Sequence, residues 1–495
     1  MKRTSLALSI SCLLFPLWVF SQEAKEAQKE MKEEEKTKER KQAPAVEKKE
    51  DKGKTTEQVK EEPKKTEGEE KEDKKKEQST DKTKKDQKET RFSFRFETSG
   101  GMIHREGALG LDEDFGFKHK EFAFSVGVPL FIVLNEGLRD RDYDERHDFG
   151  KIVRELSYER KDLGLYLKLA PVTAYNMGNA NLLSLYYSTV DRDHFRTGFV
   201  GSYNTDLAGG ELFFDSFVIP DIAGARLYFR PFWFLKKAQF LRRFEIGASL
   251  VSDFTAPSNY KYVAGRKIEL ESNGLPKVTK DTVMAYSFDT RWALIKSDEV
   301  TIAPFFSFSQ VEKGYGIEGG LAVEARPAQK HTISLLANFK RLYKSFTSPY
   351  FDSLYMVERF DFDGKPKQKA VSDEARRVRM GLGIGAAYAF NKIVSVYALT
   401  DLDEIGEFSM FRAGTSVKKA PFSFEMTFCE RGIEKISSLF NPSRALFVTR
   451  FDFRFHKNFK AFAYYGHELF VPKNDAYYKG TDTLLVGLAF LFETE

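Results

Sequence analysis

The sequence predicts an all-β fold, an antiparallel transmembrane β-barrel of about 18 strands within a range of roughly 16 to 20. Three observations predict it. Alternating aromatic segments separated by polar turns recur from about residue 91 to the end of the 495-residue chain. An apolar run near the start has the layout of an export signal, and the chain ends on an apolar, aromatic segment, residues 484–492. We therefore expect an exported barrel in the outer membrane of a Gram-negative-type envelope.

Residues 1–21 are expected to form a secretory signal peptide. Lys2 and Arg3 precede a largely apolar run over 6–20, and small residues stand before the expected cleavage point. The run is shorter than the ~20 residues that a membrane-spanning helix needs. Cys12 lies inside the apolar run and not at its end, so we do not expect lipidation. No later stretch reaches the length and apolarity of a transmembrane helix.

Residues 22–90 form a Lys- and Glu-rich segment without Phe, Tyr or Trp. Such a segment buries too little apolar surface to offset its chain entropy, so we expect a disordered, solvated spacer in the periplasm. Contact with peptidoglycan or a periplasmic partner is the alternative, although the spacer contains no recognisable binding motif. Positive and negative residues interleave, and the net charge of the chain is only +5, so no nucleic-acid partner is expected.

Residues 91–495 are expected to form the barrel. Strict alternation of apolar and polar residues begins at 92–97 and recurs over 284–294, 422–428 and 447–455. This pattern alone does not separate a soluble β-sandwich from a membrane barrel. The 47 Phe and 21 Tyr residues favour the barrel, because interfacial girdles are aromatic. Predicted strands of about 9–14 residues also suit the tilted crossing of a bilayer.

The connections between predicted strands alternate in length. Short turns are expected at 161–162, 296–299, 327–330, 391–392 and 456–458. Long loops are expected at 135–150, 176–193, 255–282, 343–377, 431–443 and 471–482. Short periplasmic turns and long external loops are typical of outer-membrane barrels. Residues 91–117 are ambiguous, because they are compatible either with an extra hairpin, giving about twenty strands, or with a plug inside the lumen.

The end of the chain resembles the assembly signal of porin-like outer-membrane β-barrel proteins, a Gly followed by two aromatic residues two positions apart. Gly487, Phe490 and Phe492 match this pattern. The resemblance implies outer-membrane lipid and the barrel assembly machinery as partners. Glu493, Thr494 and Glu495 follow, where many members of the family stop at the aromatic residue. No particular subfamily is indicated.

Nine charged residues are predicted to face the lumen, because they alternate with aromatic residues that would face lipid. They are Asp289, Arg291, Glu324, Arg326, Lys340, Glu425, Arg450, Asp452 and Arg454. A wall that carries both signs would orient polar solutes and give weak ion selectivity. The alternative is that these charges pair with one another and only keep the lumen wet. The run Arg450–Asp452–Arg454 is the preferred candidate for tuning selectivity.

The early loop at 176–193 is a candidate constriction. Asn176, Asn179 and Asn181 stand in a Gly- and Asn-rich run after a long strand. Porins often fold an early external loop into the barrel, and this loop has the corresponding position. A plain surface loop is the more common use of such a cluster, because Asn and Gly mark turns.

Neither a metal site, nor a cofactor, nor an enzyme is expected. Carboxylates alternate over 140–148 in a way that could hold Ca²⁺, but interleaved Arg residues offset their charge, which favours a solvated external loop. His331 and Ser334 are three residues apart and would lie on opposite faces of a strand, which excludes a nucleophile–base pair between them.

The leading functional hypothesis is therefore a channel through which small hydrophilic solutes diffuse across a mixed-charge lumen. The second is a transporter of apolar ligands such as fatty acids, gated by residues 91–117 as a plug. The third is a surface adhesin or structural barrel that conducts nothing. Aromatic residues in its loops would then supply contact area: Tyr260, Tyr262, Tyr343, Tyr350 and Phe351.

Overall fold

The structure is a computed structural model. It describes residues 90–494 except 135, 140–141, 144, 191–195, 264–266, 270, 272–276, 345, 360–366, 368–377, 434–438, 440–443 and 471–478. The predicted signal peptide and nearly all of the predicted spacer lie outside the described residues. Everything below concerns the described part of the chain.

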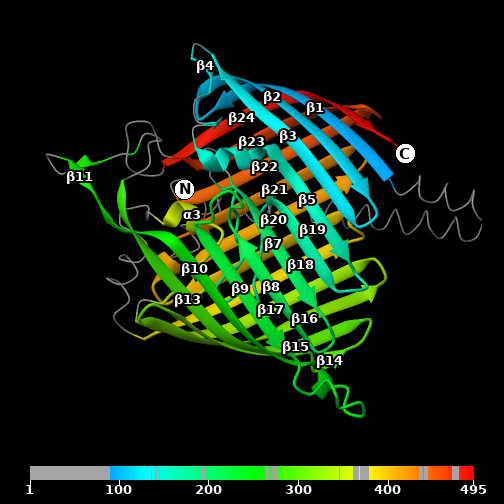
Figure 1. The fold of residues 1–495 in the computed structure, drawn as a ribbon, viewed down its shortest axis with the longest axis vertical. Coiled ribbons are helices and arrows are strands. Elements are labelled where there is room, and N and C mark those ends of the chain that lie inside the picture. The colour runs from blue at the N-terminus through cyan, green and yellow to red at the C-terminus, as the bar shows by residue number, and fades with distance from the viewer. Residues whose placement is uncertain are drawn as a thin grey trace, which may run out of the picture. The chain divides into compact units, whose positions relative to one another are not determined.

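The described residues form a closed antiparallel β-barrel (Figure 1). One sheet holds 22 strands, of which β4 (Gly137–Leu138) and β14 (Ile295–Lys296) are two-residue extensions, which leaves twenty strands in the wall. The wall strands are β1 (Thr90–Ile103), β2 (Glu106–His119), β3 (Phe122–Val133), β5 (Val153–Arg160), β6 (Leu165–Pro171), β7 (Thr197–Asn204), β8 (Ala208–Phe214), β9 (Ile222–Phe229), β10 (Phe244–Tyr260), β13 (Val278–Trp292), β15 (Val300–Val311), β16 (Gly314–Ala328), β17 (His331–Tyr343), β18 (Arg379–Phe390), β19 (Val394–Asp403), β20 (Met410–Lys419), β21 (Phe422–Arg431), β22 (Ala445–His456), β23 (Phe459–Phe470) and β24 (Lys479–Glu493).

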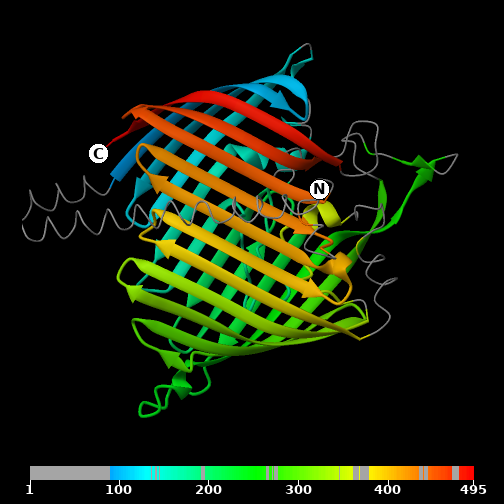
Figure 2. The ribbon, with the colours of Figure 1, turned by 180° about the vertical axis from the view of Figure 1, so that it is seen from behind.

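Each wall strand pairs with its neighbours in sequence, and the seam between the two ends of the chain closes the ring. β1 pairs antiparallel with β24 from Ser93 opposite Glu493 to Met102 opposite Leu484. The first and last strands therefore lie side by side, blue against red in both views (Figures 1 and 2). A closed ring has no unpaired edge, so the backbone polar groups of the wall find partners within the sheet.

Few elements lie outside the wall. β11 (Tyr262–Val263) and β12 (Lys267–Ile268) form a separate small hairpin. Short helical turns stand in the connections: η2 (Arg146–Ile152), η3 (Leu241–Arg243), α3 (Tyr355–Glu358) and η4 (Gly406–Phe408). Among the described residues, no helix is both long enough and apolar enough to cross a bilayer.

The predicted count of about 18 strands is two short of the twenty observed, because residues 91–117 belong to the wall. β1 and β2 form a hairpin that pairs with β24 on one side and β3 on the other. The luminal plug is therefore wrong for this segment, and the extra hairpin is right. Aromatic alternation at 92–97 already indicated a strand, whereas the glycines that followed suggested tight bends.

The lengths of the connections predict correctly which rim each one leaves from. The expected short turns join strands at the rim that holds both ends of the wall, and the expected long loops join strands at the opposite rim. Three connections break the alternation. Residues 230–243 form a long connection on the rim of the chain ends, and residues 104–105 and 312–313 form tight turns on the opposite rim.

Gly487 is required at the seam by close packing. A Cβ atom built there would lie 2.1 Å from the carbonyl oxygen of Thr98 and 2.7 Å from the ring of Phe462. Gly100, on the facing strand, has room, because its Cβ would meet only Leu109, at 3.5 Å. The two glycines therefore form a matched pair for testing the seam.

We predict that Gly487→Ala lowers the stability of the folded barrel by about 1–3 kcal/mol, the usual cost of overpacking. Gly100→Ala should leave it nearly unchanged. The measurement is the folded, heat-modifiable fraction on gels after refolding in detergent over a urea series. Equal midpoints for the two variants would contradict a tight seam at Gly487.

Candidate functional site

Two long connections fold against the inner wall of the barrel. We call residues 172–190 the first inner loop and residues 346–359 the second inner loop. They hold each other directly: Leu183 forms a parallel bridge with Phe351, the Ser184 amide donates to the Phe351 carbonyl over 3.0 Å, and the Phe351 amide donates to the Leu182 carbonyl over 2.9 Å. The loops therefore form one body inside the barrel.

The bend of the first inner loop depends on a glycine and an asparagine. Gly178 has a φ of +58°, and a Cβ there would lie 2.7 Å from Nε of Arg226 in the wall. Only glycine combines this backbone conformation with such close approach. The Asn176 side-chain oxygen accepts the Leu185 amide over 2.7 Å, which closes the loop on itself. The Gly- and Asn-rich composition thus shapes a loop that packs against the wall.

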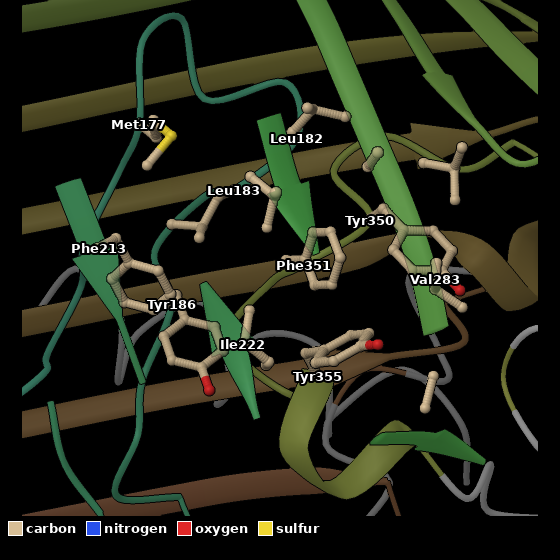
Figure 3. Close-up of a cluster of buried hydrophobic side chains, with 14 of the residues drawn as sticks. Met177, Leu182, Leu183, Tyr186, Phe213, Ile222, Val283, Tyr350, Phe351 and Tyr355 are labelled. Atoms are coloured by element: carbon tan, nitrogen blue, oxygen red, sulfur yellow. The ribbon is translucent and has the colours of Figure 1, made fainter. Parts of the chain in front are cut away.

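An apolar core joins the two loops to the wall (Figure 3). Tyr186 packs edge-on against Phe213 of β8 at 5.2 Å between ring centroids, and Phe351 packs against Tyr355 at 4.7 Å. Inward-facing residues such as Val283 of β13 complete the cluster. Burial of this apolar surface holds the loops in place.

Ion pairs tie the second inner loop to the wall. Arg359 binds Asp253 of β10 at 3.0 Å and Asp221 of the β8–β9 connection at 3.3 Å. Arg431 of β21 pairs with both Asp352 and Glu358. Because these side chains are largely buried, loss of one partner would leave a charge without compensation.

Polar contacts tie the first inner loop to β15 of the wall. The Asn179 amide donates to Oγ of Ser307 over 3.3 Å, and the Asn181 amide donates to Oγ of Ser309. Near Gly178, Arg226 pairs with Asp289 at 2.7 Å.

Three cavities adjoin one another, and the first two lie beside the first inner loop. The first, of about 420 Å³, lies between the first inner loop and strands that include β1, β2, β22 and β23. The second, of about 480 Å³, shares Thr173 with the first, and the third, of about 940 Å³, shares Asn204 with the second. The third reaches the rim of the chain ends at the 161–164 turn. The inner loops therefore fill one side of the barrel and leave space along the other.

The first cavity is lined by charges of both signs. Arg154 and Arg450 lie on it, together with Glu97 and Asp112. Arg450 pairs with Glu97 at 2.8 Å, and Arg154 pairs with Asp112 at 2.5 Å. The pairing leaves local dipoles along the cavity surface.

A titratable pair stands at the edge of the first cavity. Lys151, which lines the cavity, binds Asp148 of η2 at 2.7 Å. Burial raises the pKa of Asp148 to about 6, against the opposing effect of Lys151. The charge beside the cavity therefore changes near neutral pH.

The outer face of the wall is apolar and exposed. In β13 the outward residues Met284 and Phe288 are 51% and 58% exposed, whereas the inward residues Ser287 and Asp289 are 1% and 2% exposed. A soluble sandwich would bury its apolar face, so this arrangement requires an apolar solvent outside the wall. The same alternation holds around the ring, with exposed Leu and Phe side chains on strands from β1 to β24.

The described residues form a closed β-barrel whose apolar outer face suits a lipid bilayer. No family model and no curated protein matches the chain. Among solved structures, the chain is similar to the outer membrane protein OpdK of Pseudomonas aeruginosa, with 7% identity and a TM-score of 0.30 over 82% of this chain and 98% of that one.

Two further similar structures are OccK5 (OpdH) of Pseudomonas aeruginosa, at 8% identity and a TM-score of 0.33, and OccAB3 of Acinetobacter baumannii, at 7% and 0.29. Each covers 82% of this chain, over 98% and 99% of the respective structures. Values this low do not establish a relationship. The description of the chain as a membrane β-barrel rests on its closed wall and apolar outer face.

The nine predicted lumen residues lie on the faces of their strands opposite to the exposed apolar side chains, but they do not form one site. Asp289 and Lys340 are buried in ion pairs with Arg226 and Asp401. Arg450 and Asp452 pair with each other at 3.1 Å. The other five residues are more exposed. Glu324 pairs with Arg326 at 2.6 Å, and Glu425 pairs with Lys418 at 2.8 Å. Arg291 lines the third cavity, and Arg454 is exposed. Their part in selectivity stays a prediction.

Two readings of the loops are wrong. The first inner loop is not a plain surface loop, because Asn179 and Asn181 bind inner-wall serines. The segment 140–148 is not a solvated loop throughout, because Asp142 and Asp148 are buried and paired with Arg139 and Lys151. No cluster suited to a metal is found among the described residues.

The sequence reasoning missed the second inner loop. It treated 343–377 as an external loop with aromatic contact area, but Tyr350 and Phe351 are 2% and 0% exposed. The sequence of β13 contained a feature that could have predicted an inner loop. Val283 and Ala285 occupy inward positions where a water-filled lumen would favour polar residues, and both are buried under the loops.

We predict that Arg359→Ala loosens the second inner loop and raises single-channel conductance, with more current noise. Asp253, which is fully buried, would lose an ionic partner, and such losses cost about 3–5 kcal/mol. The control is Arg326→Ala, which removes the same charge from a more exposed pair. Identical conductance and noise in the two variants would contradict a tethering role for Arg359.

Proposed function

We propose that the protein is a channel through which small hydrophilic solutes cross the outer membrane. The observation that carries the proposal is the chain of three adjoining cavities that runs from the first inner loop to the rim of the chain ends. A barrel of twenty strands is wide enough for an aqueous channel unless something fills it. The inner loops fill one side, so solutes would pass along the other.

The first inner loop would then act as the constriction, as its position in the sequence suggested. Tyr187 and Val190 lie on the first cavity opposite the charged strands. Movement of this loop would narrow or widen the passage. Its many contacts with the wall support a fixed aperture and not a swinging gate.

Charges of both signs along the first cavity would act on solute dipoles and ions. Arg154, Arg450 and Lys151 would attract anionic groups, and Glu97 and Asp112 would attract cationic groups. Such a surface favours small polar solutes that can exchange water for protein contacts, with weak net ion selectivity.

The direct test is single-channel recording of the refolded full chain in a planar bilayer, with liposome swelling by small sugars and amino acids. Stepwise conductance and swelling that falls with solute size are expected. A folded, heat-modifiable barrel that neither conducts nor swells liposomes would overturn the proposal and leave an adhesin or structural role.

We predict that Arg450→Gln shifts the reversal potential in a KCl gradient toward cation selectivity. Glu97 would keep Lys460, at 3.4 Å, but the cavity would lose one positive charge. The matched control is Lys418→Gln, which removes the same charge away from the cavity lining. If both variants shift the potential equally, the first cavity is not the ion path.

We predict that anion selectivity increases as the pH falls from 7 to 5. Below the raised pKa of Asp148, which is about 6, the carboxyl is neutral and the Lys151 charge at the cavity is uncompensated. Asp148→Asn should show the low-pH selectivity at both pH values. The reversal potential across the pH series measures this, and a midpoint unaltered by Asp148→Asn would contradict it.

Transport of apolar ligands is a second candidate, favoured by the apolar part of the first cavity. Phe131, Leu446, Val448, Phe462 and Leu485 lie on it. Since 91–117 is wall and not plug, any gating would have to lie with the inner loops. Saturable binding of a spin-labelled fatty acid, without swelling by sugars, would favour this candidate over the hydrophilic channel.

A further inference from the structure

The segment 230–243 is unusual for its place in the barrel. It joins β9 to β10 on the rim of the chain ends, where the other connections are short. It projects away from the wall beside β14 in both views (Figures 1 and 2). Some of its residues, among them Trp233 and Arg242, line the third cavity, but Phe234, Lys236, Lys237 and Phe240 do not.

The segment extends the apolar outer wall. The Phe240 ring lies 6.0 Å from that of Trp292, the last residue of β13, and the Trp292 indole donates to the Phe240 carbonyl over 2.8 Å. Trp292 in turn packs edge-on against Phe244 of β10 at 6.4 Å. Phe234 and Phe240 remain 62% and 49% exposed. The exposed aromatic surface is therefore continuous with the lipid-facing wall.

The segment is also strongly basic. Residues 230–243 contain five Lys and Arg residues and no Asp or Glu. Arg242 shapes the segment, because its Nε donates to the Trp233 carbonyl over 2.6 Å, and Arg230 pairs with Glu245 at 2.9 Å. Lys236 and Lys237, in the middle of the segment, are exposed. Two accessible cations thus stand among exposed aromatic side chains.

We propose that residues 230–243 anchor the barrel to anionic phospholipid headgroups, in the leaflet on the side of the chain ends. Aromatic rings prefer the boundary between headgroups and acyl chains, and nearby Lys residues bind lipid phosphates. Phe234 and Phe240 enter this boundary, and Lys236 and Lys237 contact the phosphates. Continuity with the lipid-facing wall favours a lipid over a protein partner.

The chain offers a built-in reporter. It holds three tryptophans, Trp18 in the predicted signal peptide and Trp233 and Trp292 at this segment. In a Trp18→Phe chain, intrinsic fluorescence therefore reports the segment and its base alone. Subtracting the signal of a Trp18→Phe, Trp233→Phe chain isolates Trp233 without disturbing the Trp292 hydrogen bond.

The full chain is refolded into vesicles of phosphatidylcholine and phosphatidylglycerol. In one preparation the acyl chains of phosphatidylcholine carry bromine, and in the other those of phosphatidylglycerol do, at equal total bromine content. We expect Trp233 to be quenched about twofold or more strongly by brominated phosphatidylglycerol, as local enrichment of an anionic lipid requires. Lys236→Gln with Lys237→Gln should abolish that preference. The control, Lys392→Gln with Lys457→Gln in two other turns of the same rim, should retain it.

Equal quenching by both lipids in the unaltered chain would overturn the anionic preference, and so would a preference that survives Lys236→Gln with Lys237→Gln. Quenching of Trp233 by aqueous iodide but not by either brominated lipid would place the segment in water and favour a soluble partner. Conductance recorded on the same double variant should be unchanged, so failure of the anchor and failure of the channel proposal are distinguishable.

Discussion

Closure of the wall is the constraint on which the remaining features depend. In a bilayer no water is present to bind a free strand edge, so β1 must meet β24 along its length. That contact joins residues some 390 positions apart and packs Gly487 against Thr98 without room for a side chain. A ring of twenty strands has an interior that wall side chains alone cannot fill. The interior must therefore be occupied by connections, by water or by both.

The inner loops meet this requirement asymmetrically. Apolar inward residues on β8, β10 and β13 let them settle on one side, while buried charges such as Arg359 and Arg431 fix their position. The other side keeps paired charges and open space. The wall therefore carries two inner surfaces of different composition, one a protein core and the other a set of paired charges beside open space.

The fold was largely predictable, because alternation at Phe92, Met284 or Phe451 follows directly from the two faces of a strand. The inward direction of the Asp289 and Arg450 side chains could be predicted from the same rule. Their ion-pair partners could not, because the pairing of Asp289 with Arg226 and of Arg450 with Glu97 depends on strand tilt and register around the ring. The second inner loop was missed because an aromatic loop that packs inside a barrel has the same composition as one that binds outside it. Tyr350 and Phe351 illustrate that ambiguity.

The bridge between Leu183 and Phe351 has a consequence for the order of assembly. These residues are separated by the eight wall strands from β7 to β17. The first inner loop therefore cannot gain its partner until the chain has been delivered well past the middle of the barrel. The joint core of the two loops can therefore form only after thirteen of the twenty wall strands have been made. The body inside the barrel is thus completed after the strands β8, β10 and β13 on which it packs.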